Sequence, residues 1–167
     1  MSLSIKDSTG TAKTLKTTLD GSDHVTHHHV DTSGLPTGAA TDAVQKHSQA
    51  TLATSAARTA TFTSATQSNL QYRGVQVVLD VTAFANTPEI LISIEGVDPT
   101  SGKSYNILTS ESISTDWVGT YVFTVYPGIA AVTNRSVSAI IPTSWLVNVA
   151  HTDADSITYS IGAHMMK

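Results

Sequence analysis

The segment RGVQVVLDVTAF, residues Arg73–Phe84, decides the fold of this chain. Its apolar residues occupy every second position, at Val75, Val77, Leu79 and Val81. The positions between them are mostly polar. A period of two is typical of a β-strand that buries one face and exposes the other. The segment is therefore predicted to be a half-buried strand.

The same alternation recurs in four later segments: Ile90–Glu95, Tyr121–Tyr126, Trp145–Ala150 and Ile157–Ile161. Turn-forming Gly, Pro, Asn and Asp residues separate them, and short alternating segments between turns favour an antiparallel sheet. We predict an all-β fold, an antiparallel β-sandwich or jelly roll of seven or eight strands over residues 60–167. The expected core consists of Phe62, Val77, Leu79, Ile92, Ile94, Phe123, Val125, Trp145, Val147, Tyr159 and Ile161.

The first 61 residues differ in composition from the rest. All ten aromatic residues (two Trp, five Tyr and three Phe) lie from Phe62 onward, and Ile5 is the sole isoleucine before it. Large apolar side chains supply most buried area, at about 1.5–3 kcal/mol each. Without them the cost of ordering the backbone is not offset locally. Residues 1–59 are therefore predicted to be an extended N-terminal arm and linker, ordered where a partner completes a core.

The beginning of the arm has the pattern of a hairpin. Two short extended pieces, Leu3–Ile5 and Lys13–Thr18, flank Asp7–Gly10, whose residues favour a turn. The large apolar side chains of the arm are few, and we expect them to anchor it on its partner. The candidate anchors are Ile5, Leu15 and Leu19, followed by Val30 and Leu35.

The end of the arm, residues 41–57, is rich in Ala, Thr and Ser. Its Ala content is compatible with a short helix capped by Thr41 or Asp42. Its apolar face is weak, so a Thr/Ser/Ala linker is an equally good interpretation.

Composition excludes several classes of protein. The net charge of −4 and the absence of a basic stripe argue against nucleic-acid binding. No apolar run approaches the roughly 18 residues of a membrane-spanning helix. With no cysteine the chain has no disulfide, thiolate metal site or thiol nucleophile. The 26 Thr and 20 Ser instead suit broad polar interfaces.

Two motifs resemble catalytic elements but fail on spacing. The loop Gly96–Ser104 ends in Gly-Lys-Ser, yet five residues separate its glycines where a phosphate-binding loop has four. We predict a hairpin turn there. His151–Ser156 contains a His, two Asp and a Ser within six residues, which cannot converge as a hydrolytic triad. We predict a turn between two strands, no catalytic residues, no cofactor and no enzymatic activity.

The histidine run His24–His29 is the remaining candidate for chemistry. In an extended chain His27 and His29 point the same way, and imidazole is a common neutral metal ligand. Three chains meeting on an axis would bring such residues together. A run of histidines in an arm does not define a coordination geometry, so they are weak metal candidates, and a solvated or partner-binding segment is the favoured interpretation.

Several segments resemble virion proteins of tailed bacteriophages. The opening SIKDSTGTAKTLKTTLDGSDH is similar to the short N-terminal arms of such proteins. RGVQVVLDVTAF, ISIEGVDPTSGKSYNIL, TYVFTVYPG and VAHTDADSITYSIGA are similar to a recurring structural domain of phage head or minor structural proteins. The resemblance covers about 60% of the chain, and the histidine run departs from it.

The resemblance implies a structural component of the virion. The first hypothesis is a capsid decoration (cement) protein, a homotrimer whose arm binds the major capsid protein or another virion protein, with no nucleic-acid or membrane partner. A tail, neck or fibre protein anchored by the arm is the alternative. A carbohydrate-binding β-sandwich that uses Trp117 or an exposed Tyr is a further one.

Overall fold

A computed structural model describes the backbone of residues 3–6, 12–15, 47–114 and 118–167. The chain divides into two units, Met1–Thr41 and Asp42–Lys167. The first contains β1 (Leu3–Lys6) and β2 (Ala12–Leu15). The strands of the second are β3 (His47–Arg58), β4 (Phe62–Thr63), β5 (Gln67–Ser68), β6 (Gly74–Ala85), β7 (Ile90–Val97), β8 (Ser104–Thr109), β9 (Gly119–Val125), β10 (Ser136–Val137), β11 (Ser144–His151) and β12 (Ser156–Met166). The described residues contain no helix.

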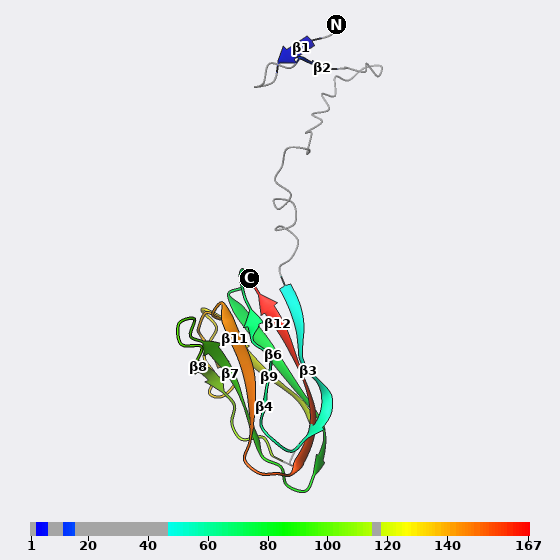
Figure 1. Ribbon diagram of the computed structural model, residues 1–167, viewed down its shortest axis with the longest axis vertical. Coiled ribbons are helices and arrows are strands. Elements are labelled where there is room, and N and C mark those ends of the chain that lie inside the picture. The colour runs from blue at the N-terminus through cyan, green and yellow to red at the C-terminus, as the bar shows by residue number, and fades with distance from the viewer. Residues whose placement is uncertain (1–2, 7–11, 16–46, 115–117) are drawn as a thin grey trace. The chain divides into compact units, whose positions relative to one another are not determined.

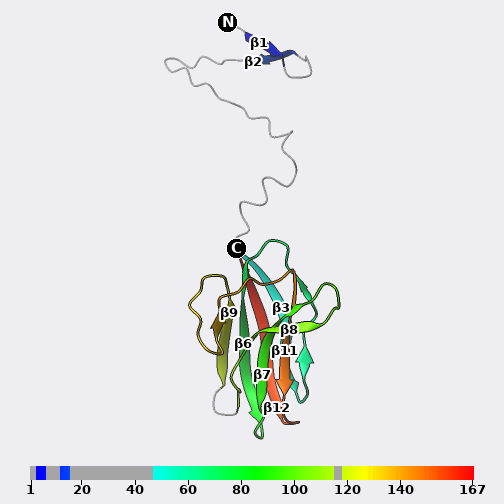
Figure 2. The same ribbon diagram turned by 90° about the vertical axis from the view of Figure 1, so that its left-hand side faces the viewer.

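The second unit is a sandwich of two sheets (Figures 1 and 2). One sheet, here the β12 sheet, has the order β10-β9-β6-β12-β3. The other, the β11 sheet, has the order β4-β11-β7-β8, and β5 also pairs with β11. All pairs are antiparallel except β9 with β10. The predicted all-β sandwich is confirmed.

The strand order is that of a jelly roll. When β3, β4, β6, β7, β8, β9, β11 and β12 are numbered one to eight, the sheets read 1-8-3-6 and 2-7-4-5. Strands one and eight, two and seven, three and six, and four and five are then neighbours, as in a long hairpin rolled into two sheets. The short strands β5 and β10 are additions to this frame.

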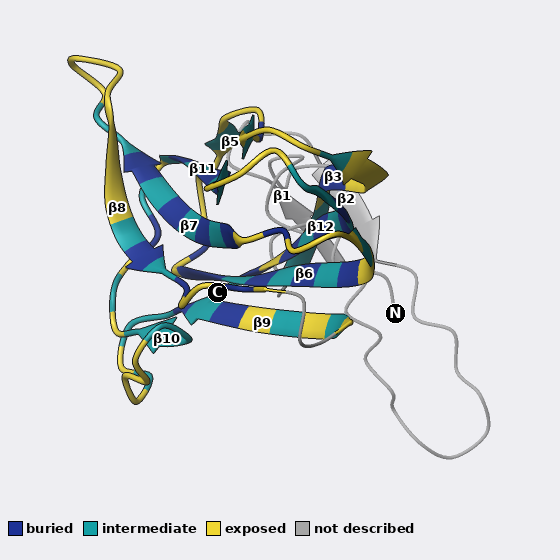
Figure 3. Ribbon diagram, turned by 90° about the horizontal axis from the view of Figure 1, so that it is seen from below, coloured by how far each residue is buried: buried dark blue, intermediate teal, exposed yellow. Residues whose placement is uncertain are grey.

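The core lies between the sheets and follows the predicted alternation. Buried and half-buried residues alternate along β6 and β7 (Figure 3). Trp145, Phe123 and Tyr159 are at most 2% exposed and are the largest of the fully buried side chains. All predicted core residues are buried except Phe62, which is half-buried and packs against the rim of the core.

Residues 47–58 correct the sequence analysis, because they form neither a helix nor a linker. They form β3, which pairs antiparallel with β12 from His47↔Met166 to Arg58↔Ile157. The sandwich therefore begins by residue 47, and the predicted boundary at 59/60 was wrong. Leu52 and Ala53 enter the core at 9% and 6% exposure. A partner about a hundred residues away overrides the weak local helix propensity of this segment.

The loop after β7 is the predicted hairpin turn. β7 and β8 pair antiparallel around it, and the Asp98 carboxylate accepts hydrogen bonds from the Ser101 hydroxyl and from the backbone N–H of Thr100. These bonds, that of Ser101 first, lower the pKa of Asp98. The loop leads from strand to strand and not into a helix, so it lacks the context of a phosphate-binding loop.

Candidate interaction surfaces

The N-terminal unit contains the predicted hairpin. β1 and β2 pair antiparallel, with Leu3 opposite Leu15 and Ile5 opposite Lys13. Two of the expected anchors, Ile5 and Leu15, therefore lie on the paired strands. The other candidates in the arm, Leu19, Val30 and Leu35 as anchors and His27 and His29 as metal ligands, lie outside the described residues.

Arg58 joins the two sheets at the edge formed by β3 and β4. Its guanidinium carbon lies 4.4 Å from the centre of the Tyr159 ring and 4.9 Å from that of Phe62. The same group donates hydrogen bonds to the carbonyl oxygens of Tyr159 (2.8 Å), Thr54 (2.9 Å) and Ala56 (3.0 Å). These contacts of the guanidinium are all with residues of its own sandwich.

His151 and Tyr159 form a polar pair between the sheets beside Arg58. Their ring centres are 6.3 Å apart, and Tyr159 is fully buried. The two imidazole nitrogens of His151 and the hydroxyl of Tyr159 have no hydrogen-bond partner among the described residues. Burial lowers the pKa of His151. The negative charge of Asp153 opposes this shift, and the positive charge of Arg58 adds to it. Burial also raises the pKa of Tyr159 to about 12.

The acids of the predicted turn between β11 and β12 bind backbone. The Asp153 carboxylate accepts a hydrogen bond from the N–H of Glu89 at 3.0 Å, and Asp155 accepts one from the N–H of Thr87 at 3.1 Å. Asp155 also accepts a hydrogen bond from the Asn86 side chain at 3.1 Å. The turn after β11 is thereby fixed to the turn after β6, which explains its acids without chemistry. We call this end of the sandwich the acid pole.

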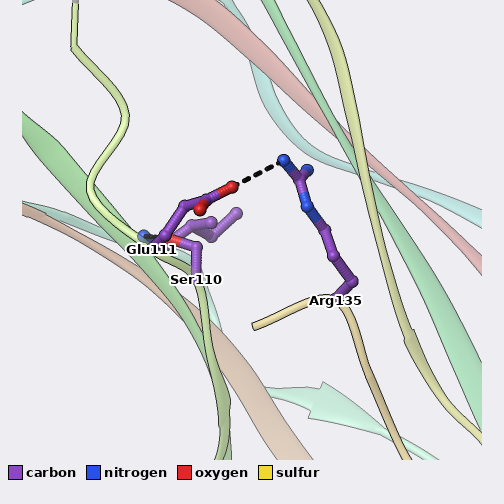
Figure 4. A network of polar contacts seen from close by, with 4 residues as sticks. Ser110, Glu111 and Arg135 are labelled. Carbon is purple, nitrogen blue, oxygen red and sulfur yellow. Dashed lines mark hydrogen bonds and ion pairs between the residues drawn. The ribbon is translucent and has the colours of Figure 1, made fainter. Parts of the chain in front are cut away.

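Arg135 has a similar role on the opposite side of the sandwich. It lies over the rings of Tyr121 (5.3 Å) and Phe123 (5.5 Å) and forms an ion pair of 2.9 Å with Glu111 (Figure 4). Beside Glu111, the Ser110 hydroxyl accepts a hydrogen bond from the N–H of Ile92 at 3.0 Å. Two arginines stacked on core aromatics therefore close both sides of the jelly roll.

The end of the sandwich opposite the acid pole carries two exposed apolar side chains. Leu70 and Ile140 are 87% and 64% exposed there, the highest values among the exposed large apolar residues. Their loops are joined by Asn69, which is 6% exposed and whose amide nitrogen donates to the carbonyl oxygens of Tyr72 (2.8 Å) and Ile141 (3.2 Å). Both apolar side chains are therefore carried on a fixed backbone.

The same end contains the start of β3 and the end of β12. His47 pairs with Met166, and the N–H of Arg73 donates to the carbonyl oxygen of Met166 at 2.8 Å. The N–H of Ile141 donates in turn to the carbonyl oxygen of Arg73 at 3.0 Å. We call this end the entry pole, because the chain enters the jelly roll there.

The outer face of the β12 sheet has a hollow near its β3 edge. The hollow has a volume of about 420 Å³, and its lining residues are Gln49, Ala50, Thr51, Gly162, Ala163 and His164. It arises at Gly162, where an added Cβ would meet only the carbonyl oxygen of Ala50, at 4.0 Å. A glycine within a strand often marks a close approach of another chain or ligand.

The exposed aromatic ring of the β7–β8 hairpin is Tyr105. It is 49% exposed, and an added Cβ at Gly96 would lie 2.3 Å from its ring, so the ring covers Gly96. Of the two tryptophans, Trp145 is in the core, and Trp117 lies outside the described residues. A stacking platform among the described residues therefore falls to Tyr105.

These surfaces consist of exposed apolar side chains, an open strand edge and a hollow, which are features suited to binding. Over residues 47–114 and 118–167, no group of three or more His, Asp or Glu side chains is placed to hold a metal ion. The surfaces that sequence reasoning missed are the β3 edge and the entry pole. In the sequence, the available signal for the entry pole was the presence of two large apolar residues, Leu70 and Ile140, within polar loops. Whether they are exposed depends on the tertiary fold.

Comparison with known proteins does not assign the chain to a family. The described part of the chain contains no helix that is long and apolar enough to cross a membrane. No family model matches the sequence, and no curated protein or solved structure is significantly similar to it.

Proposed function

We propose that this chain is a decoration protein of a tailed-bacteriophage capsid, which binds the shell through its N-terminal arm and stabilises it. The observation that carries the proposal is the division into a small unit with a hairpin, Met1–Thr41, and a jelly roll, within Asp42–Lys167. An isolated two-stranded hairpin is marginal in water. β1 and β2, of four residues each, therefore gain stability when a partner surface covers them.

The jelly roll supports a role in the virion but does not assign one. Jelly rolls occur in viral capsid proteins, in lectins and in cupins. A fold hosts many functions, so the argument must rest on surfaces. Among these classes we propose the virion, on the expectation that the strand segments resemble those of phage head or minor structural proteins.

The entry pole is the surface that fits a second contact with the shell. Its exposed Leu70 and Ile140 lie on loops joined to the end at which β3 begins. The proposal places this end of the jelly roll against the shell. The acid pole, with Asp153 and Asp155, stays in solvent. Apolar contacts surrounded by polar loops are typical of interface centres.

Deletion of residues 2–31 tests the role of the arm. The shortened protein retains all described core residues, so we expect an unchanged unfolding midpoint and at least a tenfold loss of affinity for purified particles. Repetition over many equivalent sites amplifies modest single contacts, so occupancy is measured over a concentration series. Unchanged occupancy would refute the role of the arm.

A double substitution tests the entry pole. Leu70→Ser with Ile140→Ser should weaken particle binding, whereas Val118→Ser with Val122→Ser, two other exposed apolar residues (51% and 41%), should not. Equal effects of the two pairs would argue against the entry pole. Electron microscopy of the particle distinguishes the head from the alternative location in a tail, neck or fibre.

A carbohydrate-binding role is the second candidate, and Tyr105 favours it. A half-exposed ring that lies over a glycine is a suitable stacking surface for a sugar. A glycan array probed with wild type and Tyr105→Ala tests this role. Binding lost in the variant would support it, and an array without signal at high protein concentration would discard it.

A further inference from the structure

The edge strand β3 differs from the other edges of the jelly roll. β4, β5 and β10 have two residues each and β8 has six, whereas β3 has twelve. β3 pairs with β12 on one side, and no described strand pairs with its other side. Proteins keep edge strands short or otherwise protected because unpaired N–H and C=O groups pair readily with another chain. β3 is long, so it is not protected in this way.

β3 also lacks protection by charge. No Lys, Arg, Asp, Glu or Pro occurs from Ser48 to Ala57. Arg58 at its end is held by three carbonyl oxygens and two rings of its own sandwich. It therefore does not project from the edge as a repelling charge.

The part of β3 with regular pairing is its first segment. Two register shifts against β12 lie between Ala56 and Thr51 and twist that part of the strand. From His47 to Thr51 the pairing with β12 is regular. The hollow at Gly162 lies over this segment and its β12 partner, on the face of the sheet and away from the free edge.

We propose that β3 pairs antiparallel with β3 of a second copy of this chain, about a two-fold axis at Gln49. The two β12 sheets then form one continuous sheet. In such a pair each strand faces itself, so a charge near the axis would meet a like charge. β3 offers none there, and its small Ser, Ala and Thr side chains permit close approach. An uncharged strand is thus compatible with a copy of itself.

This inference goes beyond the decoration function and does not depend on it. It predicts a dimer of twice 17.6 kDa, about 35 kDa, and not the trimer expected from the sequence. Two-fold pairing of identical surfaces closes at two copies. Solution mass therefore tests the inference without any particle.

The experiment is sedimentation equilibrium of the full chain. Wild type is compared with the double variant Gln49→Lys, Thr51→Lys, which places like charges across the axis at two exposed residues. We expect the dimer dissociation constant to rise at least tenfold. The control Thr66→Lys, Thr133→Lys changes net charge equally at exposed residues away from β3 and should leave it unchanged.

Hydrogen exchange of the wild type supplies a test without variants. On dilution from dimer to monomer, the amides of residues 47–51 should lose protection more than those of the central strand β6. A wild-type monomer at all concentrations overturns the inference. So does an oligomer that the lysines on β3 leave intact, or protection of residues 47–51 that does not depend on concentration.

Discussion

The guanidinium carbon of Arg58 lies 4.4 Å from the centre of the Tyr159 ring, and the same side chain donates a hydrogen bond to the carbonyl oxygen of Tyr159 at 2.8 Å. The same guanidinium carbon lies 4.9 Å from the ring centre of Phe62, in the facing sheet. One residue at the end of β3 thus ties the edge strand to its neighbour and both sheets to each other.

Arg58→Ala should therefore destabilise the jelly roll. Hydrogen bonds from a charged group contribute about 1.5–3 kcal/mol and an exposed cation–π contact about 0.5–1 kcal/mol. Because the side chain is half exposed, we expect a loss of about 2 kcal/mol, measured by urea unfolding. Arg58→Lys keeps the charge but not the planar fork and should recover less than half of the loss. A loss below about 0.5 kcal/mol for Arg58→Ala would contradict this role.

Phe123→Ala tests the inward face of β9. Phe123 is 2% exposed, and truncation of a buried Phe costs about 3–5 kcal/mol. Val122, its neighbour on the outer face, is 41% exposed, so Val122→Ala should cost less than about 0.5 kcal/mol. Equilibrium unfolding of wild type and the two variants measures both losses of unfolding free energy. Similar losses for the two variants would mean that the faces of β9 are assigned wrongly.

Two glycines that lie against tyrosine rings should respond differently to alanine. At Gly74 an added Cβ would lie 2.4 Å from the Tyr126 ring and 2.5 Å from the carbonyl oxygen of Val125. At Gly96 the three nearest atoms belong to the Tyr105 side chain. A backbone carbonyl cannot swing away, so Gly74→Ala should cost about 1–3 kcal/mol and Gly96→Ala less than about 1 kcal/mol.

A double variant provides the control for this pair. Gly96→Ala combined with Tyr105→Ala removes the overlapping ring, so the cost of Gly96→Ala should vanish in that background. Thermal unfolding of the four proteins of this cycle gives the coupling. If Gly96→Ala costs more than Gly74→Ala, the explanation by ring mobility is wrong.

His151 should make the protein less stable in acid. Burial lowers its pKa below the usual 6.5, so below that pH the unfolded chain binds a proton that the folded chain resists. Stability is therefore full above pH 6.5, declines as the pH falls toward the lowered value, and levels off below it. Asp153 opposes the shift and Arg58 reinforces it.

The measurement is urea unfolding of wild type and His151→Gln from pH 8 to 4. The difference in unfolding free energy between the two should shrink as the pH falls below 6.5, because glutamine does not titrate. Asp153→Asn, in a protein that keeps His151, removes the opposing charge. Its unfolding free energy should therefore fall more with decreasing pH than that of wild type. A difference that is constant with pH would contradict the assignment.

The local pattern of the sequence was sufficient for the strands that carry the core. A period of two along residues 73–84 states which side chains share a face, and burying that face is the main gain of folding. Val75, Val77, Leu79 and Val81 are accordingly fully buried. The hairpin of β7 and β8 and the turn after β11 were predictable for the same reason, since turn chemistry is local.

Only the tertiary structure decided that β3, the first strand of the jelly roll, is a strand and which surfaces are exposed. β3 contains mainly Ala, Thr and Ser, and its own sequence gives no period strong enough to distinguish strand, helix and linker. It becomes a strand because β12, about a hundred residues later, offers a row of unpaired backbone groups. The stacking of Arg58, the exposure of Leu70 and Ile140, and the open edge of β3 follow from that closure. Each depends on residues far apart in the chain, which a local pattern does not encode.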